Sequence, residues 1–305
     1  MRWKKLGIVH NSDGSQPWAT SHAQVPTPLL LNDDVLRVYY SAWDEQGRGR
    51  PAFVDLDTRD PRRVLAPPTG PILDLGTQGT FDDNGQIVCS VIKGPDGRLL
   101  MYYAGFELYR NVRYKLFTGL AHSADGVSFT RVSNIPVLDR SDAELLLRAG
   151  PCVVHEGGRF RMWYVAGSEW MEVQGKQMPV YDIRYLESKD GVVWPATGQV
   201  VMRASLPDEY GFGRPWIVKT GSGYEMYYCI RQISSNKHRL GWATSADGID
   251  WQRRDNELGL TTSPGEFDSD TIMSSAVVTL HGKTYCLYNG NDFGKVGFAL
   301  AVRES

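Results

Sequence analysis

The sequence predicts an all-β protein and, more narrowly, a five-bladed β-propeller. Three observations support this prediction: an Asp-Gly hairpin motif occurs three times, an aromatic strand occurs five times, and successive copies of that strand are about sixty residues apart. Four-stranded sheets repeated along one chain are typical of propellers, because radial repetition leaves only short, protected sheet edges. A pair of stacked β-sandwiches is the alternative that these repeats leave open.

Each copy of the first motif predicts a tight hairpin. The motif reads Ser-x-Asp-Gly-x-x-aromatic and begins at Ser123, Ser188 and Ser245. Asp-Gly favours such a turn because it supplies the positive φ values that the turn needs. A second hairpin is expected ahead of each copy. Its outgoing strands are predicted at 37–40, 99–105, 159–167, 224–228 and 283–290.

The two ends of the chain are expected to meet in one sheet. Only one further strand fits after residue 290, so the last blade lacks an outer strand. The N-terminal Trp3-Lys-Lys-Leu resembles the opening of outer strands such as Trp251-Gln-Arg-Arg. We therefore predict that the first strand completes the last blade, and that residues 1–305 form a single domain.

Charge and hydropathy narrow the class of protein. The 33 basic and 35 acidic residues give a net charge of −2, and neither sign forms a long block. A surface for nucleic acid or for an anionic membrane is therefore not expected. No apolar stretch has the length of a signal peptide or a membrane span, so we expect a soluble, cytoplasmic protein.

The cysteines and the absence of several catalytic motifs narrow the class of protein further. The four cysteines are far apart and lie in apolar runs, which predicts small buried hydrophobes rather than disulfides or zinc ligands. They are Cys89, Cys152, Cys229 and Cys286. There is no phosphate-binding glycine motif, zinc-ligand spacing or Gly-x-Ser-x-Gly elbow. We expect no organic cofactor, and a structural cation at the propeller axis stays open.

The candidate site is predicted where the starts of the five innermost strands converge. In a propeller, the loops before the innermost strands and after the second strands lie on one face, and aromatic residues such as Trp43, Tyr109, Trp170 and Tyr288 would flank the funnel there. Polar groups around a shared funnel with aromatic walls indicate a sugar pocket. The polar residues brought together are His22, Gln24, Asp82, Asp83, Asn84, Glu144, Arg148, Asp208, Glu209, Arg214, Asp268, Asp270 and Ser274.

Carboxylates in such a funnel suit glycoside chemistry. One must protonate the leaving oxygen while another stays ionised to attack or to activate water. Crowding raises the pKa of some carboxylates and leaves others low. We predict Asp83 and Glu209 as the acid/base pair, with Asp268 as a third catalytic candidate. The predicted substrate-binding residues are His22, Asp82, Arg148, Trp170, Arg214, Asp270 and Tyr288.

Structural explanations for these residues stay open. Asp82 and Asp83 could form an Asx turn that caps a strand. Glu209 could be a solvated loop carboxylate, and His22 a packed loop histidine. The two arginines could pair with the acids instead of binding substrate.

With these motifs, the whole chain resembles the five-bladed propellers of the arabinanase, levansucrase and invertase superfamily, which includes glycoside hydrolase families 32, 43, 68 and 130. The resemblance rests on the three Ser-x-Asp-Gly motifs, on Gly79-Thr-Phe-Asp-Asp-Asn-Gly and on Tyr288-Asn-Gly-Asn-Asp-Phe-Gly. It implies a propeller fold and a glycoside substrate. The branch it suggests is one associated with bacterial polysaccharide and secondary-metabolite pathways.

The acids that the resemblance implies are replaced in this chain. The arabinan-degrading branch has an Asp just before the apolar core of the first innermost strand, another Asp inside the second, and a Glu-Gly-Pro acid opening the third. This chain has Thr27-Pro28, Cys89-Ser90 and Ala149-Gly150-Pro151 there. Either the acids have moved to Asp83, Glu209 and Asp268 or Asp270, or the pocket no longer hydrolyses glycosides. We expect a glycoside hydrolase-like enzyme acting on a glycoside, an oligosaccharide or a sugar-derived small molecule. The alternatives are a biosynthetic enzyme that catalyses transfer or cyclisation, and a carbohydrate-binding propeller without catalysis.

Overall fold

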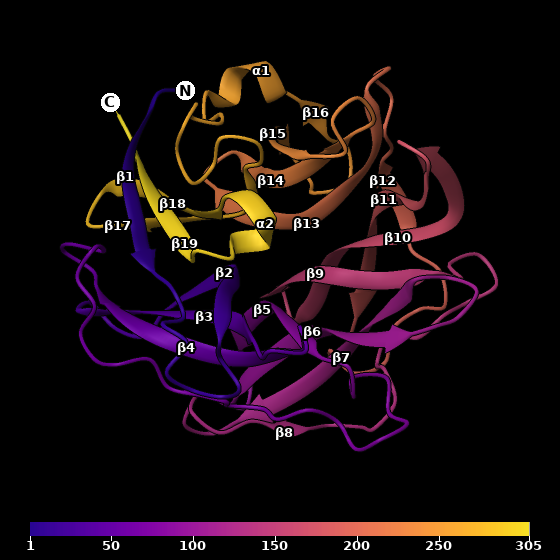
Figure 1. Cartoon of the computed structure of the whole chain (residues 1–305), viewed down its shortest axis with the longest axis horizontal. Helices are drawn as coiled ribbons and strands as arrows, with labels where there is room; N and C mark the ends of the chain where they lie inside the picture. The colour runs from indigo at the N-terminus through magenta and orange to yellow at the C-terminus, as the bar shows by residue number, and fades with distance from the viewer. Residues whose placement is uncertain (305) are drawn as a thin grey trace.

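The computed structural model describes residues 1–304, apart from the side chain of Ser168, and these residues form an all-β protein (Figure 1). Most strands belong to five antiparallel groups that follow one another along the chain, which we number 1 to 5. Group 1 contains β2 (Ser21–Leu30), β3 (Val35–Trp43) and β4 (Gly49–Asp57). Group 2 contains β5 (Gln86–Lys93), β6 (Leu99–Leu108), β7 (Tyr114–Ser123) and β8 (Thr130–Arg131).

Groups 3 and 4 repeat the order of group 2. Group 3 contains β9 (Leu147–Glu156), β10 (Arg159–Val173), β11 (Lys176–Ser188) and β12 (Gln199–Met202). Group 4 contains β13 (Glu209–Thr220), β14 (Gly223–Gln232), β15 (His238–Ser245) and β16 (Gln252–Arg253). The two helices of the described residues, α1 (Asp255–Leu258) and α2 (Asn291–Gly294), are single turns. Neither these nor any other described segment forms an apolar helix long enough to cross a bilayer.

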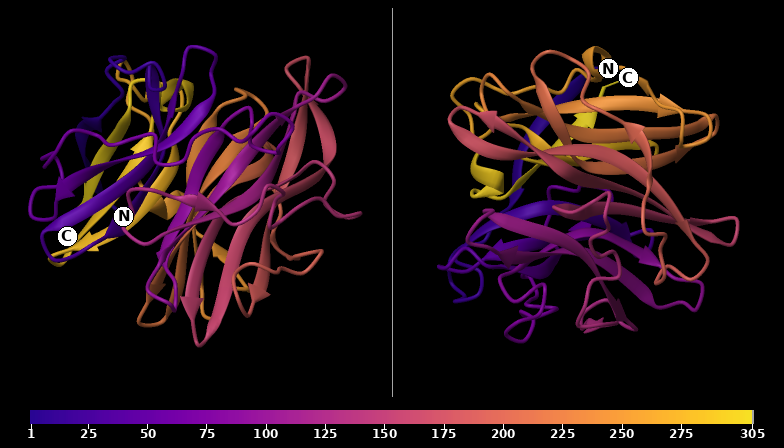
Figure 2. Two further views of the ribbon diagram at one scale, coloured as in Figure 1. Left: turned by 90° about the horizontal axis from the view of Figure 1, so that it is seen from below. Right: turned by 90° about the vertical axis from the view of Figure 1, so that its right-hand side faces the viewer.

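Group 5 joins the two ends of the chain. It contains β17 (Met273–Leu280), β18 (Lys283–Asn289), β19 (Phe298–Arg303) and β1 (Trp3–His10). The ladder between β1 and β19 runs antiparallel from Trp3 opposite Arg303 to His10 opposite Phe298. The termini consequently lie side by side (Figure 2). The pairing that we expected between the first and last strands is present.

The first strands of the groups contact one another in turn. β2 contacts β5, β5 contacts β9, β9 contacts β13, β13 contacts β17, and β17 contacts β2. Short parallel pairings of β7 with β9 and of β11 with β13 also join groups 2, 3 and 4. The starts of all five first strands are thereby brought to one region of the molecule.

The Ser-x-Asp-Gly turns hold neighbouring groups together. In each copy the serine hydroxyl accepts a hydrogen bond from the glycine N–H, and the aspartate accepts from the two residues after that glycine. The glycine carbonyl then accepts a hydrogen bond from an aromatic side chain of the preceding group. The donors are Tyr39 to Gly126 at 3.0 Å, Tyr102 to Gly191 at 2.9 Å and Trp163 to Gly248 at 2.7 Å.

Every first strand is interrupted by a bulge near its start. The register shifts at residues 25–26, 89, 150–151, 214–215 and 274–275. Proline occupies three of these bulges, at Pro26, Pro151 and Pro215, where a missing N–H does not interrupt the ladder. A bulge inserts an unpaired residue and re-aims its side chain. The five bulges therefore decide which side chains turn toward the centre.

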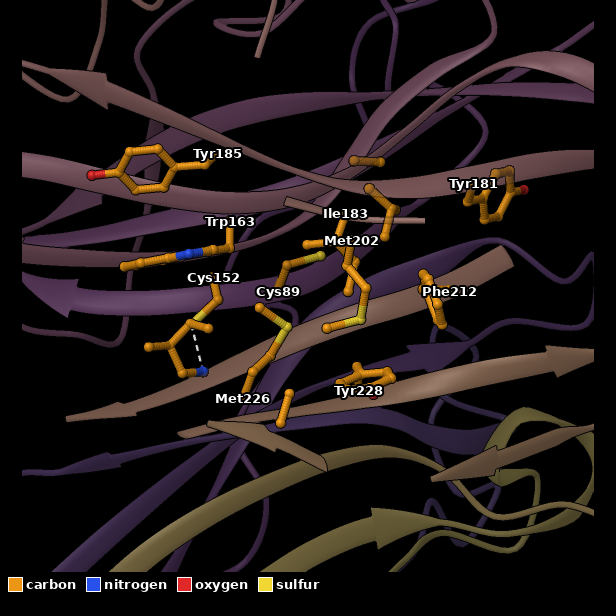
Figure 3. Close-up of a cluster of buried hydrophobic side chains, with 14 of the residues drawn as sticks. Cys89, Cys152, Trp163, Tyr181, Ile183, Tyr185, Met202, Phe212, Met226 and Tyr228 are labelled. Atoms are coloured by element: carbon orange, nitrogen blue, oxygen red, sulfur yellow. Dashed lines mark hydrogen bonds between the residues drawn. The ribbon is translucent and has the colours of Figure 1, made fainter. Parts of the chain in front are cut away.

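The cysteines are free and buried, as the apolar runs around them predicted. Cys89 and Cys152 belong to the largest cluster of buried side chains, together with Met226 and Trp163 (Figure 3). Ile217 N–H donates to Cys152 Sγ at 3.3 Å. Burial raises the pKa of the Cys152 thiol to about 11, so this cysteine is a packing residue and not a nucleophile.

Candidate functional site

The acids that precede the first strands share one buried arrangement, in which a carboxylate approaches a tyrosine of the second strand and a cation. Asp82 shows it in group 2: its side chain is fully buried and accepts hydrogen bonds from Tyr103 at 3.0 Å and from Arg131 Nε at 2.8 Å. Phe81 stacks on the Tyr103 ring, with 5.9 Å between ring centroids. Asp82 thus fastens its loop to the second and outer strands of group 2.

Groups 3 and 5 repeat the arrangement with different residues. Glu144 accepts hydrogen bonds from Tyr164 at 2.7 Å and from Arg184 at 3.0 Å, and it also pairs with Arg148. Asp268 pairs with Lys5 of β1, while Phe267 stacks on Tyr288. Gly79-Thr-Phe-Asp and Gly265-Glu-Phe-Asp are therefore two copies of one structural motif.

Group 4 divides the arrangement between two acids. Tyr228 donates to Asp255 at 2.6 Å, and Arg253 bridges Asp255 and Glu209. The Glu209 side chain is 1 % exposed and also accepts from Arg239 at 2.8 Å. A catalytic carboxylate must reach its substrate, whereas both Glu209 oxygens are already taken by guanidinium groups.

The remaining predicted acids lie nearer the solvent. Asp83 is half-buried, and its carboxylate accepts hydrogen bonds from Gly79 N–H at 2.8 Å and from Asn84. Asp270 is 60 % exposed and lies 3.8 Å from Lys237. Glu209 and Asp268 are therefore enclosed in the networks of two separate groups, whereas Asp83 is bonded within its own loop.

Three predicted binding residues have structural surroundings as well. Arg148 is buried and donates to Asp139 O at 2.7 Å and Pro195 O at 3.0 Å, beside its ion pair with Glu144. Tyr288 is fully buried next to Asp268, which with burial raises the pKa of its hydroxyl. Trp170 is half-buried on the long β10–β11 hairpin, where it pairs with Pro179.

Arg214 occupies the place where the first strands meet. Its guanidinium donates to Ser275 O at 2.8 Å, to Thr27 Oγ1 at 2.9 Å and, more distantly, to Cys89 O at 3.4 Å. These acceptors come from three other groups, and Gly150 of group 3 lies against the Arg214 backbone. Burial lowers the pKa of Arg214. Arg214 therefore contacts protein carbonyls and the Thr27 hydroxyl, and its predicted role in substrate binding stays a prediction.

A chain of contacts, partly between side chains and partly through the backbone, links all five groups at this end of the first strands. We call it the contact arc. Its members come from the starts of first strands, from the ends of second strands and from the loops and third strands that follow them. They are Trp43, His22, Asp292, Phe293, His238, Arg231, Tyr181 and Tyr114.

His22 joins groups 1 and 5 within the contact arc. Its ring stacks on Trp43 with 3.8 Å between centroids, and its Nε2–H donates to Asp292 O at 3.1 Å. Ser21 donates to Nδ1 at 2.8 Å, so the two partners fix one neutral tautomer. Burial, reinforced by Lys295, lowers the pKa of His22 to about 4. His22 is therefore an uncharged aromatic surface at pH 7.

Groups 4, 3 and 2 form the rest of the contact arc. The Phe293 and His238 rings form a T-shaped pair with 6.2 Å between centroids, and His238 lies opposite Arg231 in the β14–β15 ladder. The Arg231 guanidinium stacks on Tyr181 at 4.2 Å, and the Tyr181 and Tyr114 hydroxyls are 3.0 Å apart. Burial, Arg231 and Lys237 lower the pKa of His238 to about 3, so this ring is also neutral.

Backbone strain is concentrated in the same region. His22, Asp292 and Phe293 have φ values of 66°, 52° and 59°, and the bulge residues Arg214 and Ser274 have 33° and 55°. Such conformations are costly for residues other than glycine and gather at functional sites. Strained backbone and a row of aromatic and cationic side chains therefore point to the same end of the molecule.

Sequence reasoning identified His22 and Trp43 but missed Tyr181, Arg231, His238 and Phe293 as site candidates. The rule that loops after second strands lie on the site face was sufficient to place Arg231 and Phe293. Nothing in the sequence predicts that Tyr181, on a third strand, turns toward the centre.

Other parts of the described chain offer less for chemistry. A cavity of about 530 Å³ lies between the β13–β14 turn and β16, lined by Tyr224, Trp242 and Arg254 among others. It is at the opposite end of the strands from the contact arc. No cluster of three or more His, Cys, Asp or Glu side chains among the described residues is placed to hold a metal ion.

Comparison with known proteins found two full-length relatives and many solved structures. No protein-family model matches the chain. The relatives are the Mycobacterium tuberculosis proteins called uncharacterized protein Rv1502 (strain H37Rv) and uncharacterized protein MT1551 (strain CDC 1551). Each is 35 % identical over 305 residues, which covers 100 % of this chain and 100 % of the relative.

The solved structures share the fold. A protein titled glycoside hydrolase superposes with a TM-score of 0.74 at 20 % identity, covering 99 % of this chain and 91 % of its own. A thermostable family-43 glycoside hydrolase superposes with a TM-score of 0.69 at 15 % identity. The match covers 94 % of this chain and 90 % of that one. A structure from work on the GH130 family of mannoside phosphorylases superposes with a TM-score of 0.67 at 14 % identity. The match covers 94 % of this chain and 85 % of that one. At these identities the likeness concerns the fold alone.

Proposed function

Because this chain belongs to the same family as Rv1502 of Mycobacterium tuberculosis and has the fold of glycoside hydrolases, we propose that it binds a glycoside or sugar-derived small molecule on the contact arc. In this proposal residues 1–305 form one five-bladed propeller, each strand group is a blade, and β1 closes the ring by completing group 5. The in-turn contacts of the first strands support that interpretation.

The contact arc is the observation on which the proposed binding depends. Sugar rings stack on aromatic faces, and binding sites combine such faces with a few fixed polar groups. The arc supplies Trp43 and the half-exposed Phe293 as apolar surfaces, with neutral His22 and His238 between them. Gln24, whose Oε1 accepts from Trp43 Nε1 at 3.0 Å, lies beside the stack.

Hydrolysis is the second candidate function, and the glycoside hydrolase fold together with Asp83 favours it. Among the predicted catalytic residues, Asp83 is the one without an arginine or lysine partner in the described residues, and its carboxylate is half-buried. Glu209 and Asp268 have weaker support, because their ion pairs fasten loops to strands. Transfer or cyclisation would need the same free carboxylate.

Calorimetry with a panel of monosaccharides and oligosaccharides tests the proposed binding. We expect saturable binding that weakens at least tenfold in Phe293→Ala, because the half-exposed ring offers its face to the ligand while contributing little to the core. Val193→Ala, at an exposed side chain in the remote turn after Gly191, is the matched control and should bind normally. Absence of binding by any sugar in the panel would refute the proposal.

Chromogenic glycosides test hydrolysis. If the protein is an enzyme, Asp83→Asn should abolish turnover while the melting temperature stays near that of the wild type. Glu209→Gln and Asp268→Asn should instead lower the free energy of unfolding by about 1.5–3 kcal/mol, because each removes charged hydrogen bonds to a partly buried cation, Arg253 or Lys5. Normal turnover in Asp83→Asn would remove Asp83 from the mechanism.

A further inference from the structure

The charge partners of the buried arginines single out one end of the contact arc. Four arginine side chains are buried: Arg37, Arg148, Arg214 and Arg231. Arg37 pairs with Asp55 at 2.8 Å, and Arg148 pairs with Glu144. Within the described residues, Arg214 and Arg231 have no carboxylate partner, and both belong to group 4 at the end where the first strands meet.

Arg231 is held in place by uncharged groups. Its guanidinium lies between the rings of Tyr181 and Tyr210, at 4.2 Å from each centroid, and Nη1 donates to Pro179 O at 2.6 Å. The Tyr210 hydroxyl also lies close enough to interact with the guanidinium. Within the described residues, no carboxylate and no second carbonyl accepts a hydrogen bond from this guanidinium. The cation is thus rigidly held without a charged partner.

Charges of both signs lie around Arg231. Lys237 is close enough, together with Arg231, to disfavour protonation of His238. The acids nearby have other partners: Asp208 accepts hydrogen bonds from Ser234 N–H at 2.7 Å and from Gln232 at 3.0 Å, and the exposed Asp270 lies 3.8 Å from Lys237. Within the described residues, neither of these acids forms an ion pair with Arg231.

A buried cation without a counterion is unfavourable, because desolvation of the charge is not offset by an ion pair. An anionic ligand would supply the missing charge and reduce this cost. An arginine whose plane is fixed between two rings is suited to a carboxylate or a phosphate, which it can bind with two parallel hydrogen bonds. A hydroxyl-only sugar would leave this charge uncompensated.

We propose that the ligand of the contact arc is an anionic sugar, whose carboxylate or phosphate binds the Arg231 guanidinium while its ring lies against His238 and Phe293. The proposal rests on the proposed glycoside binding and narrows the class of ligand. It assigns Arg231 as the residue that selects for charge, and Phe293 as a residue that contacts the ring.

The test is calorimetry with four probes: glucose, glucuronate, glucose 6-phosphate and inorganic phosphate. We expect at least one of the two charged sugars to bind tenfold or more tightly than glucose, and inorganic phosphate to bind more weakly than the charged sugar. In Arg231→Gln the ratio of the charged-sugar affinity to the glucose affinity should fall to about one. Arg98→Gln removes an exposed arginine at a remote turn and should leave the ratio unchanged.

Each other outcome has a definite meaning. If none of the sugars binds, the proposed function fails together with this inference. If glucose binds as tightly as both charged sugars, or if Arg231→Gln keeps the wild-type ratio, the anion selectivity alone is refuted. If inorganic phosphate binds as tightly as glucose 6-phosphate, the site recognises a free anion and the sugar assignment is wrong.

A measurement on the wild type covers the case in which Arg231→Gln does not fold. The affinity for the charged sugar should fall as ionic strength rises from 0.05 to 0.5 M, with the glucose affinity constant, since salt screens the ligand's charge. Arg231→Lys keeps the charge without the planar fork, and it should bind the charged sugar between the wild type and Arg231→Gln. Affinities independent of salt for both ligands would overturn the inference.

Discussion

At the residue scale, group 1 differs from groups 2 to 5 in the partner of its second-strand tyrosine. Tyr103, Tyr164 and Tyr228 donate to carboxylates, and Tyr288 lies beside Asp268. In group 1 the equivalent Tyr40 instead contacts the imidazole of His10, with 4.8 Å between ring centroids. An uncharged histidine therefore takes the place of an acid where group 1 meets group 5.

His10 makes folding stability depend on pH. Burial lowers the pKa of His10 to about 4, against about 6.5 in an unfolded chain. Between these pH values the unfolded state binds more protons, so the free energy of unfolding falls as the pH decreases. From pH 7 to pH 5 the loss due to His10 should be about 2 kcal/mol, at 1.36 kcal/mol per pH unit below 6.5. Urea unfolding at both pH values measures it.

The variant His10→Phe provides the comparison. His10 Nε2 is buried without a hydrogen-bond partner, so a phenyl ring loses no bond there. The variant should lose less stability than the wild type between pH 7 and pH 5, while the contribution of His22 remains. An identical pH dependence in both proteins would mean that His10 is not the titrating group.

At the element scale, the Asp-Gly turns act between groups as well as within a hairpin. The glycine at each turn needs a positive φ, and its carbonyl meets an aromatic donor of the preceding group. At Gly191 a side-chain Cβ would lie 2.6 Å from the Tyr102 hydroxyl oxygen and 2.9 Å from Phe160. The turn thus requires glycine for close packing in addition to backbone conformation.

Gly191→Ala and Gly158→Ala separate these two requirements. Both glycines have a φ of +73°, but no atom lies within 4 Å of a Cβ at Gly158. Gly158→Ala should lower the free energy of unfolding by about 1–2 kcal/mol through backbone strain. Gly191→Ala should lower it by about 1–3 kcal/mol more, because Tyr102 and Phe160 must move. Equal losses in denaturant unfolding would show that the turn tolerates a side chain.

At the scale of the whole molecule, the chain ends stabilise one another. β1 supplies the hydrogen-bonding partner of β19, and its Lys5 is the charge partner of the fully buried Asp268. Without β1, an edge of group 5 and a buried carboxylate would both be left unpaired. These two costs fall on the same group, which contacts group 1 and group 4 through β17.

Deletion of residues 1–10 should therefore abolish the cooperative thermal transition. Circular dichroism and the melting curve measure this. Deletion of Met1 and Arg2, which precede β1, is the control, and it should shift the melting temperature by only a few degrees. Lys5→Met isolates the ion pair and should cost about 3–5 kcal/mol, since it leaves Asp268 uncompensated. A native-like melting curve without residues 1–10 would contradict the role given to β1.

The sequence alone determined the strands, their hairpins and the pairing of the chain ends. These features depend on local chemistry: alternating aromatic residues favour strands, Asp-Gly permits a positive φ, and an unpaired last strand requires a partner. The same reasoning placed Arg214 at the centre, because its position within a first strand follows from the repeat.

The tertiary structure alone decided which polar residues are free to act. Asp82, Glu209 and Asp268 look alike in sequence to any acid before a strand, yet each is enclosed by a cation from an outer strand far away in the chain. Arg231 and Tyr181 look like ordinary strand residues, but bulges and inter-group packing bring them together. A side chain's freedom depends on its neighbours in space, and those neighbours are set by the packing of whole sheets.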